Sequence, residues 1–184
     1  MAETKENSWK KISDKTVYDN PWIKVEEHQV INPGGGNSIY GKVHFKNRAI
    51  GIIALDEELN TWLVGQWRYT LNEFSWEIPE GGGPLDQDIL TSAQRELMEE
   101  TGMLAKRWEM IMKFHTSNSV TDEVGYIFLA EDLEKGESKL EETEADLIVK
   151  KLPYKEALQM VMDGTITDSM SVAGILKVAR LKNL

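Results

Sequence analysis

Three glutamates on one turn of a predicted helix mark the part of the chain best suited to chemistry. Glu96, Glu99 and Glu100 are separated by the i, i+3 and i+4 spacing that makes side chains neighbours on a helix surface. Like charges this close repel one another, and burying any of them is costly unless something positive neutralises it. A divalent cation would do so. Because the chain has no cysteine and no cluster of histidines, these carboxylate ligands favour Mg2+ or Mn2+.

The helix that carries these glutamates is expected to run from about residue 86 to residue 101. Asp86 is a suitable N-cap, and Asp88 would then lie in the first turn, where a negative charge is favourable. Gly102 is placed to end the helix.

One side of this helix should face the core. At about 100 degrees per residue, Leu90, Ala93 and Leu97 fall in one narrow sector. Glu100 falls in the same sector and Glu96 lies at its edge, so at least one carboxylate should be buried and need a partner. The alternative is that the Glu-rich turn is a solvated face held by ordinary Arg–Glu pairs.

The rest of the chain predicts a mixed sheet with helices packed on its faces, an α/β (α+β) fold. Alternating or continuous apolar runs predict strands at 22–31, 39–45, 49–55, 61–69, 73–79, 108–115, 123–130 and 147–152. Further helices are expected at 153–162 and from Ser169 or Ser171 onward. Residues 80–86 are expected to form a Gly-Pro-rich loop, and residues 131–146 an acidic loop.

Two parts are expected along the chain. Residues 1–47 would hold a polar lead and a β-hairpin at 22–46, and residues 48–184 the main domain. A two-stranded hairpin is marginal alone, so it should pack on something, and a second subunit is a natural partner. A homodimer would supply such a partner.

Composition limits the classes of function. The 184 residues include 31 Asp and Glu against 21 Lys and Arg, a formal charge of -10, with 41% hydrophobic residues. The hydrophobic fraction is sufficient for a globular core, whereas the negative charge disfavours nucleic acid as a partner. With no signal-like N-terminus and no apolar run of about 18 to 20 residues, we expect a cytoplasmic protein and no membrane partner.

The stretch around the three glutamates resembles a known motif, the Nudix box. Its pattern is Gly, five residues, Glu, seven residues, Arg-Glu-hydrophobic, one residue, Glu-Glu, one residue, Gly-hydrophobic. The matching residues are Gly81, Arg95, Glu96, Leu97, Glu99, Glu100, Gly102 and Met103. Gln87 stands where the pattern has its first Glu. The resemblance implies a Nudix α/β/α sandwich with a mixed sheet, preceded here by an N-terminal antiparallel β element.

The resemblance also implies roles for individual residues. The metal ligands would be Glu96, Glu99, Glu100 and the backbone carbonyl of Glu80. Arg95 would orient the glutamates, and Glu99 and Glu100 would count among the catalytic groups. Gln87 would alter the pairing of Arg95 or weaken metal affinity without abolishing activity.

Two further segments resemble a subgroup of the family, the ADP-ribose and nucleoside diphosphate sugar pyrophosphatases. They are residues 65–69 and residues 76–82, which contain Arg68 and Glu77, with Glu80 where Ala is common. The resemblance implies that Arg68 and Glu77 bind the substrate, with Arg68 on its phosphate, for which a guanidinium group is well suited. The alternative is that Arg68 simply pairs with Glu73 or Glu77.

The remaining contacts expected from the subgroup lie in less specific stretches. Trp22, Trp67 or Tyr69 would stack on the base and Arg48 would touch it, although aromatic residues on strands more often serve packing. A general base would come from the acidic loop, where Glu142 and Glu144 are favoured and Glu141 is a neighbour.

These observations predict a Mg2+-dependent enzyme that hydrolyses the pyrophosphate bond of nucleoside diphosphate sugars such as ADP-ribose or GDP-mannose. The products would be a nucleoside monophosphate and a sugar phosphate. Two alternatives stay open. One is a Nudix-fold sensor that binds nucleotide sugars without cleaving them, which Gln87 favours. The other is a hydrolase of nucleoside triphosphates or RNA 5' ends.

Overall fold

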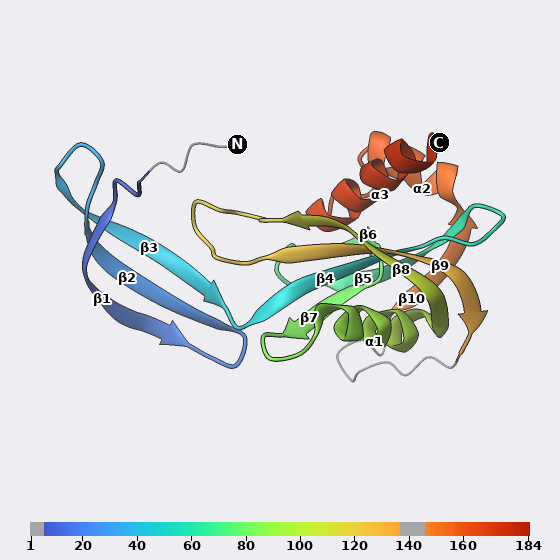
Figure 1. Cartoon of the computed structure of the whole chain (residues 1–184), viewed down its shortest axis with the longest axis horizontal. Coiled ribbons are helices and arrows are strands. Elements are labelled where there is room, and N and C mark those ends of the chain that lie inside the picture. Colours follow the sequence, from blue (N-terminus) through green and yellow to red (C-terminus); the bar gives the residue numbers. More distant parts are fainter. Residues whose placement is uncertain (1–5, 137–145) are drawn as a thin grey trace. The chain divides into compact units, whose positions relative to one another are not determined.

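The computed structural model describes residues 6–136 and 146–184 (Figure 1). Contacts divide the chain into two units. The first contains the residues up to Asn47 together with the loop Ser117–Glu123, and the second contains Arg48–Thr116 and Val124–Leu184. Among the described helices, none has the length and apolar character needed to cross a bilayer.

The first unit is an antiparallel sheet with the strand order β1-β2-β3. Its strands are β1 (Lys10–Asp19), β2 (Ile23–Ile31) and β3 (Asn37–Phe45). The expected hairpin is therefore a three-stranded sheet, and β1 occupies much of the segment interpreted as a polar lead. Every residue of β1 is exposed, so this edge strand lacks the alternation of buried and exposed positions that identifies a strand in a sequence.

The loop Ser117–Glu123 completes the first unit. The Val43 amide donates to the Val120 carbonyl at 2.9 Å, and the Asp122 amide donates to the Val43 carbonyl at 3.1 Å. The Asp122 carboxylate accepts a bond from the Phe45 amide and contacts His44 Nδ1 at 2.7 Å. These contacts attach a loop from far along the chain to strand β3.

The second unit contains two sheets. One is mixed and has the order β7-β4-β9-β8, with β4 parallel to β9 and β8 antiparallel to β9; the other has the antiparallel order β10-β5-β6. The strands are β4 (Asn47–Ala54), β5 (Asn60–Arg68), β6 (Glu73–Glu77), β7 (Glu80–Pro84), β8 (Met103–Phe114), β9 (Gly125–Lys135) and β10 (Ile148–Pro153).

Three of these strands differ from the sequence prediction. The stretch expected to be a Gly-Pro-rich loop contains β7, which pairs with β4 at the sheet edge. β8 begins at Met103 instead of Trp108, and β9 continues to Lys135 into the expected acidic loop. In each case the strand contains residues with low strand propensity, and pairing with a neighbouring strand outweighs that local preference.

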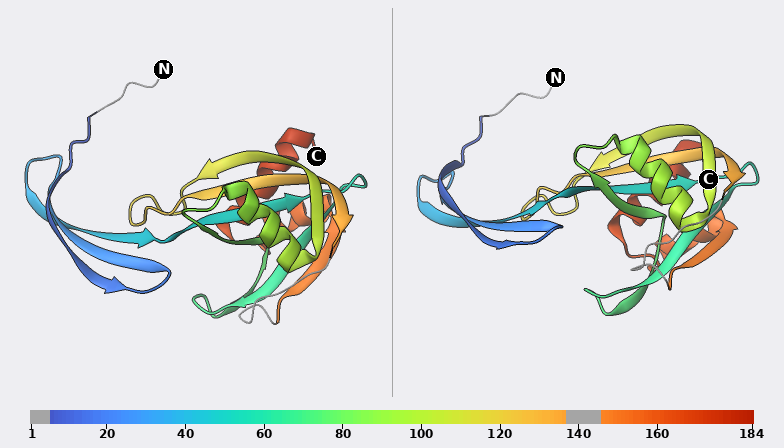
Figure 2. Two further views of the ribbon diagram at one scale, coloured as in Figure 1. Left: turned by 60° about the horizontal axis from the view of Figure 1, so that its bottom comes forward. Right: turned by 90° about the horizontal axis from the view of Figure 1, so that it is seen from below.

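Helices cover both faces of the mixed sheet, as in the expected α/β/α sandwich. They are α1 (Ile89–Thr101), α2 (Tyr154–Met162) and α3 (Ser169–Lys182). Figure 1 shows α1 below the strands and α2 and α3 above them, and the turned views of Figure 2 bring α1 to the front. One buried apolar cluster includes Ala93 and Leu97 of α1, and the other includes residues of α2 and α3.

The helix ends show how the sequence sets α1. Its N-cap is Asp88, two residues later than the expected Asp86, and the Asp88 carboxylate accepts a bond from the Thr91 amide at 3.0 Å. Gly102 ends the helix as expected, with a left-handed φ of 67°. The start of α3 is capped by Asp168, whose carboxylate accepts a bond from the Ser171 amide at 2.7 Å.

Candidate functional site

The predicted core-facing carboxylates of α1 are buried. Glu100 is 1% exposed and Glu96 5%, beside the fully buried Ala93 and Leu97. The helix periodicity therefore located these two side chains correctly. Glu99 is partly buried, with 20% of its side chain exposed. The alternative of a wholly solvated face is excluded for this turn.

Arg95 binds two of the three glutamates. Its Nη2 donates to Glu96 Oε1 at 2.6 Å, and its Nη1 donates to Glu99 Oε2 at 2.7 Å. A further bond from Nη2 reaches the Gly82 carbonyl at 2.8 Å, which ties the helix to β7. Burial alone would lower the pKa of Arg95, but the charges and hydrogen bonds of Glu96 and Glu99 outweigh it and raise the pKa. The guanidinium group therefore forms an ion pair with each of these two carboxylates.

The backbone of β7 lies against the two buried carboxylates. The Glu80 amide donates to Glu100 Oε2 at 2.9 Å. At Gly81, a Cβ would lie less than 3 Å from the carboxyl carbon and both oxygens of Glu96, so a side chain there would displace that carboxylate. Close approach of the Glu96 carboxylate therefore favours glycine at this position; a left-handed backbone does not, since the φ of Gly81 is not positive.

Gln87 and Arg48 support the segment between β7 and α1. Gln87 Oε1 accepts a bond from Ser92 Oγ at 3.0 Å. The Arg48 guanidinium donates to the carbonyls of Pro84, Leu85 and Gln87 at 2.7 to 3.1 Å. Arg48, expected to touch a base, is engaged here in holding this segment.

The donor set around α1 fits a hard divalent cation. Three carboxylates share one helical turn, two of them are buried, and Arg95 balances one of their three charges. Within residues 6–136 and 146–184, no three acidic or histidine side chains already form a group that could hold a metal ion. Instead, Glu96 and Glu99 contact Arg95, and Glu100 accepts the Glu80 amide.

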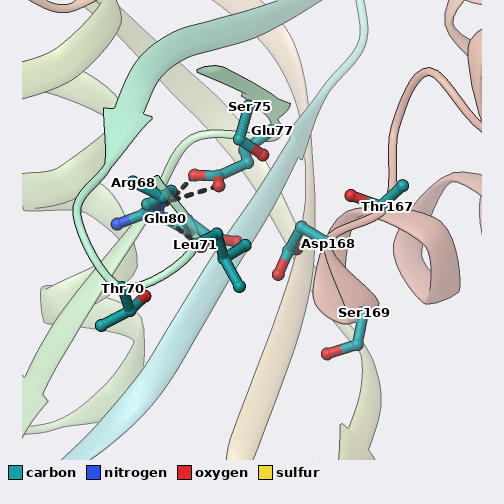
Figure 3. Close-up of a pocket in the computed structure, with 9 residues that line it drawn as sticks. All are labelled: Arg68, Thr70, Leu71, Ser75, Glu77, Glu80, Thr167, Asp168 and Ser169. Carbon is teal, nitrogen blue, oxygen red and sulfur yellow. Dashed lines mark hydrogen bonds and ion pairs between the residues drawn. The ribbon is translucent and has the colours of Figure 1, made fainter. Parts of the chain in front are cut away.

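A cavity of about 500 Å³ opens beside Glu80 (Figure 3). Its polar lining includes Arg68, Ser75, Glu77, Glu80, Thr167 and Asp168. The β5–β6 hairpin and the start of β7 form one wall, and the segment leading into α3 forms the other. Because the Glu80 amide also binds Glu100, the cavity adjoins the buried carboxylates.

Arg68 is fixed in this cavity by two glutamates. Its Nε donates to Glu77 Oε1 at 2.8 Å, its Nη2 donates to Glu80 Oε1 at 3.0 Å, and the same Nη2 contacts Glu77 Oε2. The alternative kept for Arg68, a pair with Glu73 or Glu77, is realised with Glu77, whereas Glu73 lies opposite Arg68 in the β5–β6 ladder. Burial would lower the pKa of Arg68, but these carboxylates raise it.

The side chain of Glu80 is a feature that sequence reasoning missed. Only its carbonyl was assigned a role, yet its carboxylate is 12% exposed and lines the cavity. Its Oε2 is buried without a hydrogen-bond partner. Burial, followed by the charges of Asp168 and Glu77, raises the pKa of Glu80 well above its ordinary value. In the sequence, the departure from Ala at this position could have indicated a role for the Glu80 side chain. For Asp168, the sequence indicated only a place before a helix.

The roles expected of the other predicted site residues stay predictions. Trp22 lies in the first unit and is 66% exposed. Trp67 is 55% exposed and pairs with Phe74, on the opposite face of β5 from Arg68. Glu142 and Glu144, as well as Glu141, lie outside the described residues.

Two family models match this chain. The NUDIX domain model matches residues 45–166, and the nucleoside diphosphate sugar hydrolase N-terminal domain model matches residues 9–43. An ADP-ribose pyrophosphatase of Mycobacterium tuberculosis is 34% identical, over 94% of this chain and 84% of that protein. A second ADP-ribose pyrophosphatase, from Bacillus subtilis, is 33% identical, over 90% of each chain.

Two further proteins are similar to this chain, one in sequence and one in structure. A methanol dehydrogenase activator of Bacillus methanolicus is 32% identical, over 90% of each chain. A crystal structure of an ADP compounds hydrolase has a TM-score of 0.86 at 17% identity and covers 96% of this chain and 95% of its own. That likeness supports the fold.

Proposed function

Since the chain belongs to the Nudix hydrolase family, we propose that it hydrolyses the pyrophosphate bond of nucleoside diphosphate sugars. The products are a nucleoside monophosphate and a sugar phosphate. ADP-ribose is the first substrate to test, because two of the similar proteins are ADP-ribose pyrophosphatases. Like other members of the family, the enzyme depends on a divalent metal ion.

One observation carries this proposal. Glu80 connects the buried carboxylates of α1 to the cavity that contains Arg68, because its amide binds Glu100 and its carboxylate binds Arg68. The proposed metal ligands and a polar cavity thus adjoin one another, which suits a diphosphate that is joined to a sugar and a nucleoside. The substrate's diphosphate would lie near α1 and one of its ends in the cavity.

The proposed metal is Mg2+, held by Glu96, Glu99, Glu100 and the Glu80 carbonyl. When bound, such an ion screens the diphosphate and lowers the pKa of an attacking water. Arg95 is proposed to orient Glu96 and Glu99, to which it already donates. Gly81 is proposed to leave room for the Glu96 carboxylate.

The remaining proposed roles are those of a general base, a phosphate-binding residue and the groups that stack on the base of the substrate. Glu142 or Glu144 is proposed as the general base that removes a proton from water. Arg68 is proposed to contact a phosphate oxygen through Nη1, for which the described residues provide no hydrogen-bond partner, while Nε and Nη2 bind Glu77 and Glu80. Glu77 would thus position Arg68. Trp22 and Trp67 remain the proposed stacking groups for the base.

A homodimer in the cytoplasm is also part of the proposal. The first unit carries exposed apolar side chains on a three-stranded sheet, among them Ile12, Val17 and Ile39 at 60% to 65% exposure. So small a sheet with so much exposed apolar surface favours a covering partner. Light scattering coupled to size exclusion would give the mass, and a monomer at micromolar concentration would contradict the dimer.

The experiment is product analysis by chromatography, with and without Mg2+. The compounds are ADP-ribose, GDP-mannose and nucleoside triphosphates, and the variant is Glu100→Gln. Glu109→Gln is the matched control, because Glu109 is an exposed residue of β8. We expect metal-dependent monophosphate from the nucleotide sugars, a loss of at least about 100-fold in Glu100→Gln, and no change in Glu109→Gln.

Three other results of this experiment would contradict the proposal. Tight binding of ADP-ribose without turnover would identify a sensor, the function that Gln87 favours. Turnover confined to triphosphates would identify the other alternative. Full activity in Glu100→Gln would refute the assigned metal site even if the substrate class were correct.

A further inference from the structure

The start of α3 holds the backbone segment between β6 and β7. Ser171 is fully buried in the first turn of α3, and its Oγ accepts a hydrogen bond from the Ile78 amide at 2.9 Å. Ser171 is itself fixed, because its amide donates to the Asp168 carboxylate that caps the helix. Figure 3 shows this start of α3, marked by Asp168, across the cavity from Arg68. Ser171 and Ile78 are 93 positions apart, so their bond connects two distant parts of the second unit.

Side-chain packing at this contact leaves little room for movement. A Cβ at Gly51 of β4 would lie less than 3 Å from Met170 Sδ and from Ile78 Cδ1. Met170 and Ile78 therefore both pack directly on the backbone of Gly51, and their side chains are buried, at 6% and 0% exposure. The first turn of α3, the Ile78 side chain and β4 thus form one close-packed contact in the core.

The backbone held in this way continues into the proposed metal site. The Pro79 carbonyl accepts a bond from an amide of β4 at 2.9 Å, and the Glu80 amide donates to Glu100 Oε2 at 2.9 Å. Together with the bond from Ile78 to Ser171, these bonds fix three consecutive residues. The Glu80 carbonyl, which is proposed as a metal ligand, belongs to the last of the three. Its position therefore depends on the hydroxyl group of Ser171.

We propose that Ser171 is a positioning residue for the metal site, and that its hydroxyl group sets the Glu80 carbonyl by holding the Ile78 amide. This inference rests on the proposed function. Without the hydroxyl group, a buried amide would lose its acceptor, and buried polar groups nearly always have a partner. The segment would then shift to recover one. Groups that support metal ligands in this way typically contribute about 10- to 100-fold to metal affinity or activity.

Three variants separate this role from a general loss of stability. Ser171→Ala removes the hydroxyl group, and Ser171→Thr keeps it. Tyr154→Phe is the matched control, because it removes another buried hydroxyl that bonds to α3: Tyr154 Oη donates to the Ile175 carbonyl at 2.5 Å. Tyr154→Phe should therefore destabilise the fold about as much as Ser171→Ala while leaving the bond at Ile78 intact. Thermal unfolding measures both effects, and if Ser171→Thr does not fold, the comparison of the other two variants still decides.

Metal affinity is the quantity that a merely structural role would not change. It is measured by Mn2+ binding without substrate, followed by water proton relaxation, and by the Mg2+ dependence of ADP-ribose hydrolysis. We expect Ser171→Ala to bind Mn2+ about 10-fold more weakly and to need about 10-fold more Mg2+ for half its maximal rate. Ser171→Thr and Tyr154→Phe should remain close to the wild type. Equal metal affinity in Ser171→Ala and Tyr154→Phe would overturn the proposal.

Hydrogen exchange of the Glu80 amide in the metal-free protein tests the route of this effect. Exchange should be about 10-fold faster or more in Ser171→Ala than in Tyr154→Phe, because the bond to Glu100 is weakened when the segment shifts. Equal exchange in the two variants would show that the Ser171 hydroxyl does not act through the segment, and the proposal would fail.

Failure of the proposed function would be recognised separately. Mn2+ binding needs no substrate, so it decides on Ser171 even if the wild type cleaves none of the compounds tested. A wild type that binds Mn2+ without cleaving any nucleotide sugar would refute the proposed function alone. A wild type that binds no Mn2+ would refute the metal site and the role of Ser171 together.

Discussion

Substituting Gly81 by alanine is expected to reduce activity strongly while leaving the stability of the fold almost unchanged. The added Cβ would lie less than 3 Å from the carboxyl carbon and both carboxylate oxygens of Glu96. Ordinary contacts of a Cβ are 3.4 to 4 Å. The Glu96 carboxylate must therefore shift by roughly 1 Å, while the backbone, whose φ is not positive, tolerates alanine.

The two consequences have different sizes. The group that moves is the far end of a flexible side chain, so its displacement costs little stability. Alanine also lowers the conformational entropy of the unfolded chain, which stabilises the fold by about 0.4 to 1 kcal/mol. The free energy of unfolding should therefore change by less than about 1 kcal/mol. A displacement of the proposed ligand Glu96 by about 1 Å, in contrast, can cost about 100-fold in activity. Gly81→Ala should therefore fold normally and lose about 100-fold in kcat/KM.

The assay is hydrolysis of ADP-ribose over a range of Mg2+ concentrations, with urea unfolding in parallel. Gly41→Ala is the matched control, because a Cβ at Gly41 would meet nothing within 4 Å. We expect an increased Mg2+ requirement in Gly81→Ala and none in Gly41→Ala. Wild-type activity in Gly81→Ala would show that the position of the Glu96 carboxylate does not limit the reaction, and the argument from close approach would be refuted.

Two further predictions concern stability. Asp88→Ala should destabilise the protein by about 1 kcal/mol through loss of the α1 cap, whereas Asp86→Ala should have no such effect; urea unfolding of both measures this. Burial alone would raise the pKa of Asp122, but hydrogen bonds from Lys42 and His44 lower it to about 2 from 3.8. The charged form therefore stabilises the fold above about pH 4, and about 1 to 2 kcal/mol should be lost as the pH falls towards 2. Acid titration of Asp122→Asn should lack this loss, and an identical profile would contradict the assignment.

The helix of the Nudix box could be derived from the sequence because its signals are local. Periodicity placed Glu96 and Glu100 on the buried side, and Gly102 marked the helix end. The N-cap was assigned two residues early because Asp86 and Asp88 are equally suitable by type. Only the fold of the preceding segment decides between them.

The missed features depend on contacts between distant parts of the chain. β1 is exposed throughout, so its strand structure comes from pairing with β2 and leaves no pattern in its own residues. Likewise, the cavity brings together Glu80 and Asp168, which are far apart in the sequence. A single sequence contains no periodicity that connects such positions.

Because the loop Ser117–Glu123 belongs to the first unit, the N-terminal sheet cannot be encoded by one continuous stretch of the gene. The chain passes between the two units three times, after residue 47 and on either side of this loop. A truncation that began at Arg48 would leave Val120 and Asp122 without the backbone partners that β3 supplies. A fusion or domain exchange must therefore transplant two separate stretches of sequence together, and recombination at a single crossover would yield a chimera with mismatched halves.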